Sequence, residues 1–167
     1  VLLPERQLLD KIWGGRVLAE RLALEAPRLG ETWDCYDRGP ASSAGFRNLA
    51  GVTLHELCRD RRDELLGEAQ LDDFGRFPLM LKLLDATQRL SLQVHPDDEQ
   101  ARGMQIGDTG KTEAWVVLQA RESAALVCGY RVEAAELCDA FLRADFNEDL
   151  LELRAARAGD VVAIPPG

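Results

Sequence analysis

Apolar residues in this chain fall into short runs separated by turn residues, and the period of the runs changes along the sequence. Residues 78–86 are nearly continuously apolar but contain Lys82, which predicts a buried strand whose lysine needs a partner or a cavity. Residues 89–95 alternate, which predicts a strand with one apolar and one polar face. The apolar face would carry Leu90, Leu92 and Val94, and the polar face Ser91, Gln93 and His95.

Two stretches carry the signals of a helix start. Thr53 opens a partly apolar stretch that stops at Gly67, and Glu56 follows three residues after Thr53, as in a capping box. We expect one helix between these limits, with His55 on its charged and solvated side. Asp97 is the expected cap of a short helical turn further along the chain.

Alternation and Gly or Pro turns predict further strands. They lie within residues 29–40, 113–120, 124–130, 151–156 and 161–164, and residues 132–149 are typical of one or two short helices. The strands of 113–120 and 124–130 are expected to form a hairpin-like pair. Many short strands separated by such turns suggest an antiparallel sandwich or a small barrel with inserted helices.

Composition limits the classes of function. The 167 residues suggest one domain, and 46% hydrophobic residues are enough for a packed core. A net charge of −9 makes the chain a poor binder of nucleic acid or anionic membranes, and no run of about 20 apolar residues could span a bilayer. A small anionic substrate would need a local cationic pocket.

The four cysteines have no C-x-x-C spacing and form no zinc-finger pattern. We therefore expect reduced thiols in a cytoplasmic protein. The first residues soon become charged, which does not fit a secretory signal peptide. Only three of the 20 basic residues are lysines, so each lysine is a stronger candidate for a specific role.

Gln93, His95 and Glu113 are candidate metal ligands. Gln93 and His95 are two positions apart, so on a strand their side chains point to the same face. An amide oxygen, a neutral imidazole and a carboxylate suit Zn²⁺ or a similar divalent ion. Taken without further context, a hydrogen-bonded pair on a sheet face is the favoured explanation of Gln93 and His95, and Glu113 could be an exposed carboxylate at the start of a strand.

Several longer motifs carry a resemblance to a known family. FPLMLKLLDATQRLSLQVHPDDEQA followed by GKTEAWVVLQA resembles type I mannose-6-phosphate isomerases (phosphomannose isomerases) of the cupin superfamily. The upstream KIWGG and LGETW and the closing AGDVVAIPPG are similar to that family in the same order. The resemblance covers most of the chain.

The resemblance implies a mainly β fold, namely a cupin-type antiparallel jelly-roll or barrel with inserted helices. It implies that Gln93, His95 and Glu113 are zinc ligands. The family's fourth ligand is a histidine a few residues beyond a P-P-G-type turn, and Gly167 precedes that position. We therefore expect a single cupin-like metal-binding domain over residues 1–167, which stops before the end of the family's first jelly-roll.

The implied reaction interconverts mannose 6-phosphate and fructose 6-phosphate through an enediol or enediolate, so the implied partner is a small phosphorylated hexose. Lys111 and Glu31 are the candidates for the catalytic proton-transfer group, and Lys111 could also contact phosphate. Ser91, Lys82 and Trp13 are candidates for substrate binding, although each could be an ordinary structural residue. Two alternatives remain: a non-catalytic cupin that binds sugar phosphate or metal, and an inactive fragment without the fourth ligand.

Overall fold

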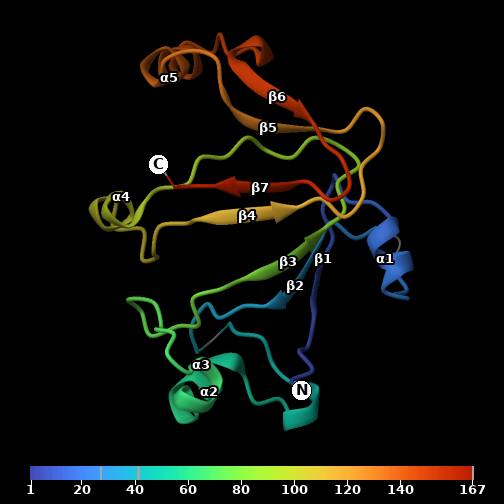
Figure 1. Cartoon of the computed structure of the whole chain (residues 1–167), viewed down its shortest axis with the longest axis vertical. Helices are drawn as coiled ribbons and strands as arrows, with labels where there is room; N and C mark the ends of the chain where they lie inside the picture. The colour runs from blue at the N-terminus through green and yellow to red at the C-terminus, as the bar shows by residue number, and fades with distance from the viewer. Residues whose placement is uncertain (27, 41, 167) are drawn as a thin grey trace. The chain divides into compact units, whose positions relative to one another are not determined.

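The computed structural model describes residues 1–26, 28–40 and 42–166 (Figure 1). Two compact units make up the chain, Val1–Ser91 and Leu92–Gly167. The first contains a three-stranded sheet, and the second contains two separate two-stranded sheets. All the pairings between these strands are antiparallel, as the sequence predicts.

The sheet of the first unit has the order β1-β2-β3, with β2 in the centre. Its elements are β1 (Gln7–Leu9), α1 (Val17–Arg21), β2 (Glu31–Cys35) and β3 (Leu81–Leu84). Trp33 in β2 is the register partner of Lys82 in β3. Strand β2 buries Thr32 and Asp34 on one face and leaves Glu31 and Trp33 half-buried on the other.

The predicted helix after Thr53 is interrupted. It forms α2 (Leu54–Asp60) and α3 (Arg62–Leu66), after the short 3-10 turn η1 (Arg47–Leu49). The capping box of Thr53 and Glu56 is present as predicted. A single helix was the wrong prediction, because Arg61 leaves the helical region at φ −136° and ψ 40° and thereby caps both segments.

The core of the first unit lies between β2 and α2. Its buried members are Tyr36, Ala44, Phe46, Leu54, Leu57 and Cys58. Burial raises the pKa of the Cys58 thiol to about 11, with smaller contributions from the charges of Asp37 and Cys35. This thiol therefore stays protonated at neutral pH and acts as a small apolar side chain.

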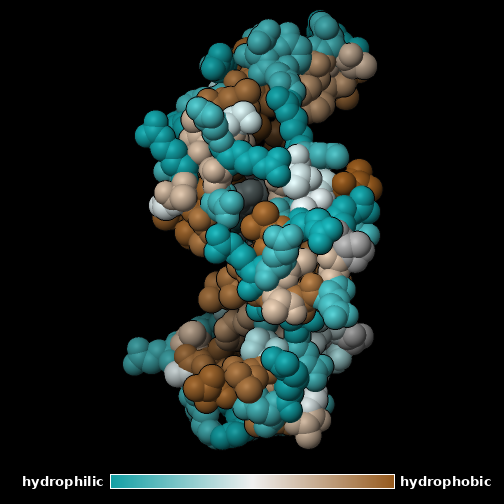
Figure 2. Space-filling model, turned by 90° about the vertical axis from the view of Figure 1, so that its right-hand side faces the viewer, coloured by the Kyte–Doolittle hydropathy of each residue, from teal (hydrophilic) through white to brown (hydrophobic). Residues whose placement is uncertain are grey.

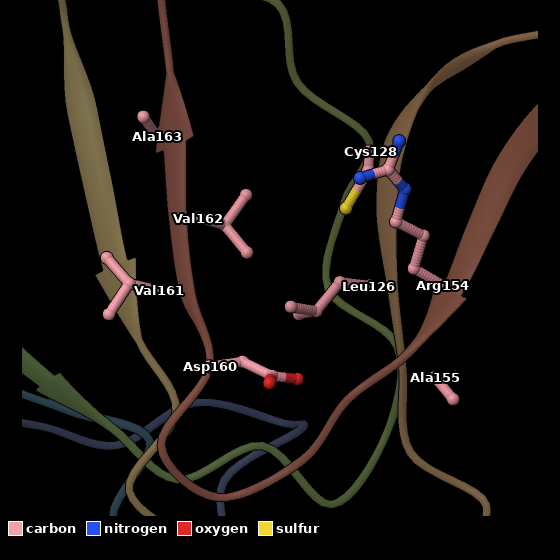
Figure 3. A pocket seen from close by; sticks show the side chains of 8 residues that line it. All are labelled: Leu126, Cys128, Arg154, Ala155, Asp160, Val161, Val162 and Ala163. Atoms are coloured by element: carbon pink, nitrogen blue, oxygen red, sulfur yellow. The ribbon is translucent and has the colours of Figure 1, made fainter.

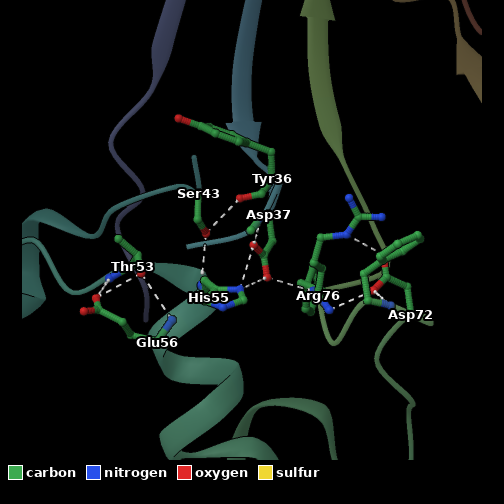
Figure 4. A network of polar contacts seen from close by, with 11 residues as sticks. Tyr36, Asp37, Ser43, Thr53, His55, Glu56, Asp72 and Arg76 are labelled. Atoms are coloured by element: carbon green, nitrogen blue, oxygen red, sulfur yellow. Dashed lines mark hydrogen bonds and ion pairs between the residues drawn. The ribbon is translucent and has the colours of Figure 1, made fainter. Parts of the chain in front are cut away.

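A buried polar network ties this core to its loops (Figure 4). The fully buried side chain of Asp37 accepts hydrogen bonds from the backbone N–H groups of Gly39 (2.9 Å) and Phe77 (3.0 Å) and contacts Nδ1 of His55 (3.1 Å). The backbone N–H of His55 donates to Oγ of Ser43 (3.0 Å). The carboxylate of Asp37 thus links the end of β2, the start of α2 and the segment that leads into β3.

The solvated position predicted for His55 is wrong. Its side chain is only 19% exposed, because the loop after β2 folds Asp37 against the first turn of α2. The charged residues that follow in α2 and α3 do face water, among them Arg59 and Glu64. The pattern of polar residues along a helix predicts which side of the helix is polar. It does not predict that a loop from another part of the chain will cover a residue on that side.

The second unit pairs strands that are distant in sequence. It contains α4 (Asp98–Gly103), β4 (Glu113–Val116), β5 (Ala125–Tyr130), α5 (Ala134–Leu142), the 3-10 turn η2 (Glu148–Leu150), β6 (Leu151–Ala155) and β7 (Val161–Ile164). Strand β4 pairs with β7, and β5 pairs with β6. The predicted hairpin of 113–120 with 124–130 is therefore wrong, although both strands exist in shorter form.

Two predictions about strand context also fail. Residues 89–95 form no strand, and Val94 on their predicted apolar face is 76% exposed. Strand β3 is shorter than the run 78–86 and is not fully buried, since Leu81 is 57% exposed. The predicted helical turn is correct: Asp97 caps α4 in a capping box with Gln100.

Hydrophobic residues reach the surface in several places (Figure 2). Large side chains that are more than half exposed include Leu79, Leu118, Leu142 and Val161. Among the residues described, no helix combines the length and the apolar character that a bilayer span requires.

Replacing Asp37 tests the buried network. In Asp37→Ala, two backbone N–H groups and the His55 ring lose their acceptor inside the protein, so unfolding should become easier by roughly 3 kcal/mol. Chemical denaturation followed by circular dichroism measures the change. Asp60→Ala is the matched control, because Asp60 is an exposed carboxylate paired with Arg59 and its loss should leave the unfolding transition almost unchanged. Equal effects of the two substitutions would contradict the role given to Asp37.

Candidate metal centre

Three polar side chains meet at the start of β4 in the second unit. Nε2 of His95 lies 3.4 Å from Oε2 of Glu113. The ammonium of Lys111 lies 2.8 Å from Oε1 of Glu113 and 3.1 Å from Nε2 of His95. His95 and Glu113 are mostly buried, with side chains 17% and 25% exposed, whereas Lys111 is 44% exposed.

A close contact between two turns brings these side chains together. The backbone N–H of Lys111 donates to the carbonyl of Pro96 (3.0 Å), and the N–H of Gly110 donates to Oδ1 of Asp98 (2.8 Å). Gly110 lies so close to the other turn that an added Cβ would be 2.5 Å from the carbonyl carbon of Asp97. The turn that follows His95 therefore fixes the backbone of Lys111, which lies two positions before Glu113.

The carboxylate of Glu113 is held in its charged form. Burial alone would raise its pKa, but the hydrogen bond and charge of Lys111, the hydrogen bond from Trp115 and the nearby His95 together lower the pKa below its usual value. The indole Nε1 of Trp115 lies 3.4 Å from Oε2. Glu113 is therefore ionised at neutral pH, as a metal ligand must be.

The spacing of His95 and Glu113 fits a shared metal ion. Zinc bonds of about 2.0–2.2 Å in a tetrahedral arrangement place neighbouring donor atoms about 3.3–3.6 Å apart, and the observed separation is 3.4 Å. Within residues 1–26, 28–40 and 42–166, no group of three or more His, Cys, Asp and Glu side chains is arranged to hold a metal ion. The predicted set contains only two side chains of those types, because its third member is the amide of Gln93.

Gln93 is exposed on the segment that precedes His95. Because this segment is not a strand, the two-residue spacing of Gln93 and His95 does not place their side chains on one strand face. Lys111 likewise precedes β4, which begins at Glu113, yet its ammonium still reaches the carboxylate two residues later. The predicted metal ligands His95 and Glu113 therefore contact each other, and both contact Lys111, which was predicted as a catalytic and substrate-binding residue.

A second polar cluster occupies the half-buried face of β2 in the first unit. The carboxylate of Glu31 lies 3.8 Å from the ammonium of Lys11 and 3.6 Å from that of Lys82. Nε1 of Trp33 donates to Oε2 of Glu31 (2.9 Å), and the Lys82 ammonium lies 4.8 Å from the centre of the Trp33 ring. The lysine that interrupts the apolar run thus has the partners that its sequence context required.

Trp13 belongs to the surroundings of this cluster. Its ring and the side chain of Lys11 lie over Gly30, where an added Cβ would be 3.1 Å from Cζ3 of Trp13 and 2.4 Å from Cβ of Lys11. The carbonyl of Trp13 accepts a hydrogen bond from the backbone N–H of Thr87 (2.9 Å), which ties this turn to the end of β3. Ser91, the remaining predicted residue of this unit, is exposed at its end.

Sequence reasoning missed Lys11, Trp33 and Trp115. The signal that could have found the two tryptophans is the repeated Glu-x-Trp pattern, at residues 31–33 and 113–115. On a strand, positions i and i+2 share a face, so the indole N–H can reach the carboxylate. The structure shows this pairing at both places.

A cavity of about 400 Å³ lies elsewhere in the second unit, beside β5, β6 and β7 (Figure 3). Arg154, Cys128 and Asp160 supply its polar lining, and the other lining residues are Leu126, Ala155, Val161, Val162 and Ala163. Arg154 already pairs with Glu152 (2.8 Å). Asp160 accepts from the backbone N–H of Arg157 (2.7 Å). None of the predicted site residues lines this cavity.

Comparison with known proteins identifies the class. The family model described as phosphomannose isomerase type I, catalytic domain, matches residues 3–121. The chain is 33% identical over 160 residues to the mannose-6-phosphate isomerase ManA of Bacillus subtilis (strain 168), covering 95% of this chain and 50% of that protein. It is 34% identical over 170 residues to the mannose-6-phosphate isomerase of Streptococcus mutans, covering 99% and 52%. The chain belongs to the type I phosphomannose isomerase family.

A solved structure agrees with this assignment. The crystal structure of the mannose 6-phosphate isomerase from Bacillus subtilis matches with a TM-score of 0.84 and 32% identity, over 99% of this chain and 52% of that one. The fold of this chain is therefore that of a mannose 6-phosphate isomerase over the matched part. The chain spans about half the length of the curated relatives it matches.

Substituting Gly110 tests how the site is assembled. The added Cβ of Gly110→Ala would overlap the turn at Asp97, so the turns should separate and the protein should lose roughly 1–3 kcal/mol of stability. Binding of Zn²⁺ by the candidate ligands His95 and Glu113 should weaken as well. Thermal unfolding and retained zinc are the measurements. Gly103→Ala is the control, since its added Cβ meets no atom within 4 Å and alanine favours the helix. Wild-type zinc retention in Gly110→Ala would show that the turn contact does not hold the site.

Proposed function

We propose that this chain carries the metal-binding part of a zinc-dependent aldose–ketose isomerase that interconverts mannose 6-phosphate and fructose 6-phosphate through an enediol or enediolate. The observation that carries the proposal is the 3.4 Å spacing of His95 Nε2 and Glu113 Oε2, in a chain that belongs to the family. Gln93, His95 and Glu113 would hold the ion. When bound, Zn²⁺ would act as a Lewis acid toward the oxygens of the sugar.

The charge of the site favours a developing anion. Glu113 is the one carboxylate in the proposed ligand set, and Lys111 adds a positive charge 2.8 Å from it. Isomerisation moves a proton between C1 and C2 of the open-chain sugar, and negative charge develops on the carbonyl oxygen as the C–H bond breaks. The ammonium of Lys111 can donate a proton to such an oxygen, and the neutral amine that remains has the lone pair needed to accept a proton. Lys111 is therefore our first candidate for proton transfer.

The cluster around Glu31 supplies cationic character to an otherwise acidic chain. Lys11 and Lys82 flank a single carboxylate, so the three side chains together carry one positive charge. We assign contact with the phosphate to Lys82 and Ser91, and contact with the sugar to Trp13. Glu31 is the second candidate for proton transfer, because its half-buried carboxylate is oriented by Trp33.

We also propose that residues 1–167 form a single domain with a cupin-type jelly-roll fold. Support for a cupin-type jelly-roll within one domain over residues 1–167 comes from the antiparallel pairing of the strands and from the likeness to the Bacillus subtilis isomerase. The four cysteines are free thiols, which agrees with the cytoplasmic location predicted from the sequence.

Zinc content and isomerase activity of the 167-residue chain test the proposed function. We expect zinc to bind, and His95→Ala to weaken binding by more than about 100-fold, since even loss of a ligand's partner typically costs 10–100-fold. His55→Gln is the matched control, because it replaces the only other histidine. Any isomerase activity that the wild type or a variant shows with mannose 6-phosphate should require added Zn²⁺. Equal zinc retention by His95→Ala and the wild type would reject the site.

Substitution of Lys82 tests the assigned phosphate contact. Lys82→Met should weaken the binding of mannose 6-phosphate by roughly tenfold, because one charged hydrogen bond to phosphate is lost. Isothermal titration calorimetry gives the affinity. Arg59→Met removes the same charge from an exposed helix surface and should leave binding unchanged. A similar loss in both variants would mean that only the net charge matters.

A further inference from the structure

Lys111 contacts the same nitrogen that would bind the metal. Its ammonium lies 3.1 Å from Nε2 of His95, and this Nε2 lies 3.4 Å from Oε2 of Glu113. A neutral imidazole presents one lone pair, on the ring nitrogen that carries no proton. That lone pair can accept a hydrogen bond from an ammonium or bind a cation, but it cannot do both.

The two carboxylate oxygens of Glu113 have different partners. Oε1 lies 2.8 Å from the Lys111 ammonium, whereas Oε2 is the oxygen beside His95. A cation held by His95 Nε2 and Glu113 Oε2 leaves the contact between Lys111 and Oε1 in place. Only the contact between Lys111 and His95 has to break.

The backbone around Lys111 is held by the neighbouring turn. Only the side chain of Lys111 therefore has to move when its contact with His95 breaks. The backbone N–H of Lys111 donates to Pro96, and Gly110 packs against Asp97. The side chain itself is 44% exposed and has room to turn away from the imidazole. The other two lysines are placed differently, since Lys11 and Lys82 pair with Glu31 in the first unit.

We propose that Lys111 competes with the divalent cation for His95, so that metal loading transfers the Lys111 ammonium from the imidazole toward the substrate. This inference rests on the proposed metal site. It gives Lys111 two states: in one it holds His95 and Glu113 together, and in the other it is free of His95 and can donate to a substrate oxygen. The freedom of Lys111 to contact the substrate then depends on whether the metal occupies the lone pair of His95 Nε2.

The affinity for Zn²⁺ tests the competition without any use of activity. Wild type, Lys111→Met, Lys111→Arg and Lys11→Met are titrated with Zn²⁺ against a chromophoric chelator. Lys111→Met should bind Zn²⁺ about tenfold more tightly, because the competing charged hydrogen bond is gone. Lys111→Arg keeps a cationic donor and should stay near the wild type, and Lys11→Met should equal it. Unchanged or weaker binding by Lys111→Met would overturn the competition.

Thermal unfolding provides a second readout, which also detects a misfolded variant. Without Zn²⁺, Lys111→Met should unfold at a lower temperature than the wild type, because His95 and Glu113 lose their shared partner. With excess Zn²⁺ the two should unfold at similar temperatures, so zinc stabilises the variant more. An equal zinc-induced shift in both proteins would contradict the exchange. If no protein binds Zn²⁺ better than His95→Ala does, the proposed metal site itself is wrong and the competition falls with it.

Discussion

The contact between two turns in the second unit is the constraint on which the candidate site depends. Residues 96–98 and 107–111 meet through the hydrogen bond from Lys111 N–H to the Pro96 carbonyl and through the tight approach of Gly110. His95 directly precedes the first turn, and Glu113 opens the strand after the second. Their side chains therefore meet although neither residue lies on a long regular element. The contact between these two turns, and not a sheet, holds the two residues in place.

The two polar clusters use the same local chemistry on different strands. In each, a strand carboxylate accepts from the indole N–H two residues later and pairs with lysine. The indole takes up one direction of the carboxylate and limits its rotation, while the ammonium keeps it charged. Glu31 has two lysines, so its cluster is cationic, whereas Glu113 has Lys111 and His95 beside it. This difference is the reason why we propose an anion at the first cluster and a cation at the second.

Local features were predictable from the sequence, and features that depend on distant partners were not. The capping boxes at Thr53 and Asp97 were predicted correctly because each involves residues three apart. The pairing of β4 with β7 was missed because paired residues lie 45–51 positions apart in the sequence, and an alternating pattern does not indicate which strand is the partner. His95 and Glu113 were placed together by motif resemblance, while the strand expected at 89–95 is absent.

Lysine is so rare in this chain that its chemistry is confined to the two clusters. Each of Lys11, Lys82 and Lys111 contacts a carboxylate there, whereas the arginines carry most of the remaining positive charge. Reagents that acylate side-chain amines therefore have no lysine target away from these carboxylates. A peptide map of such labelling would report directly on the accessibility of the two clusters, with little background from the rest of the surface.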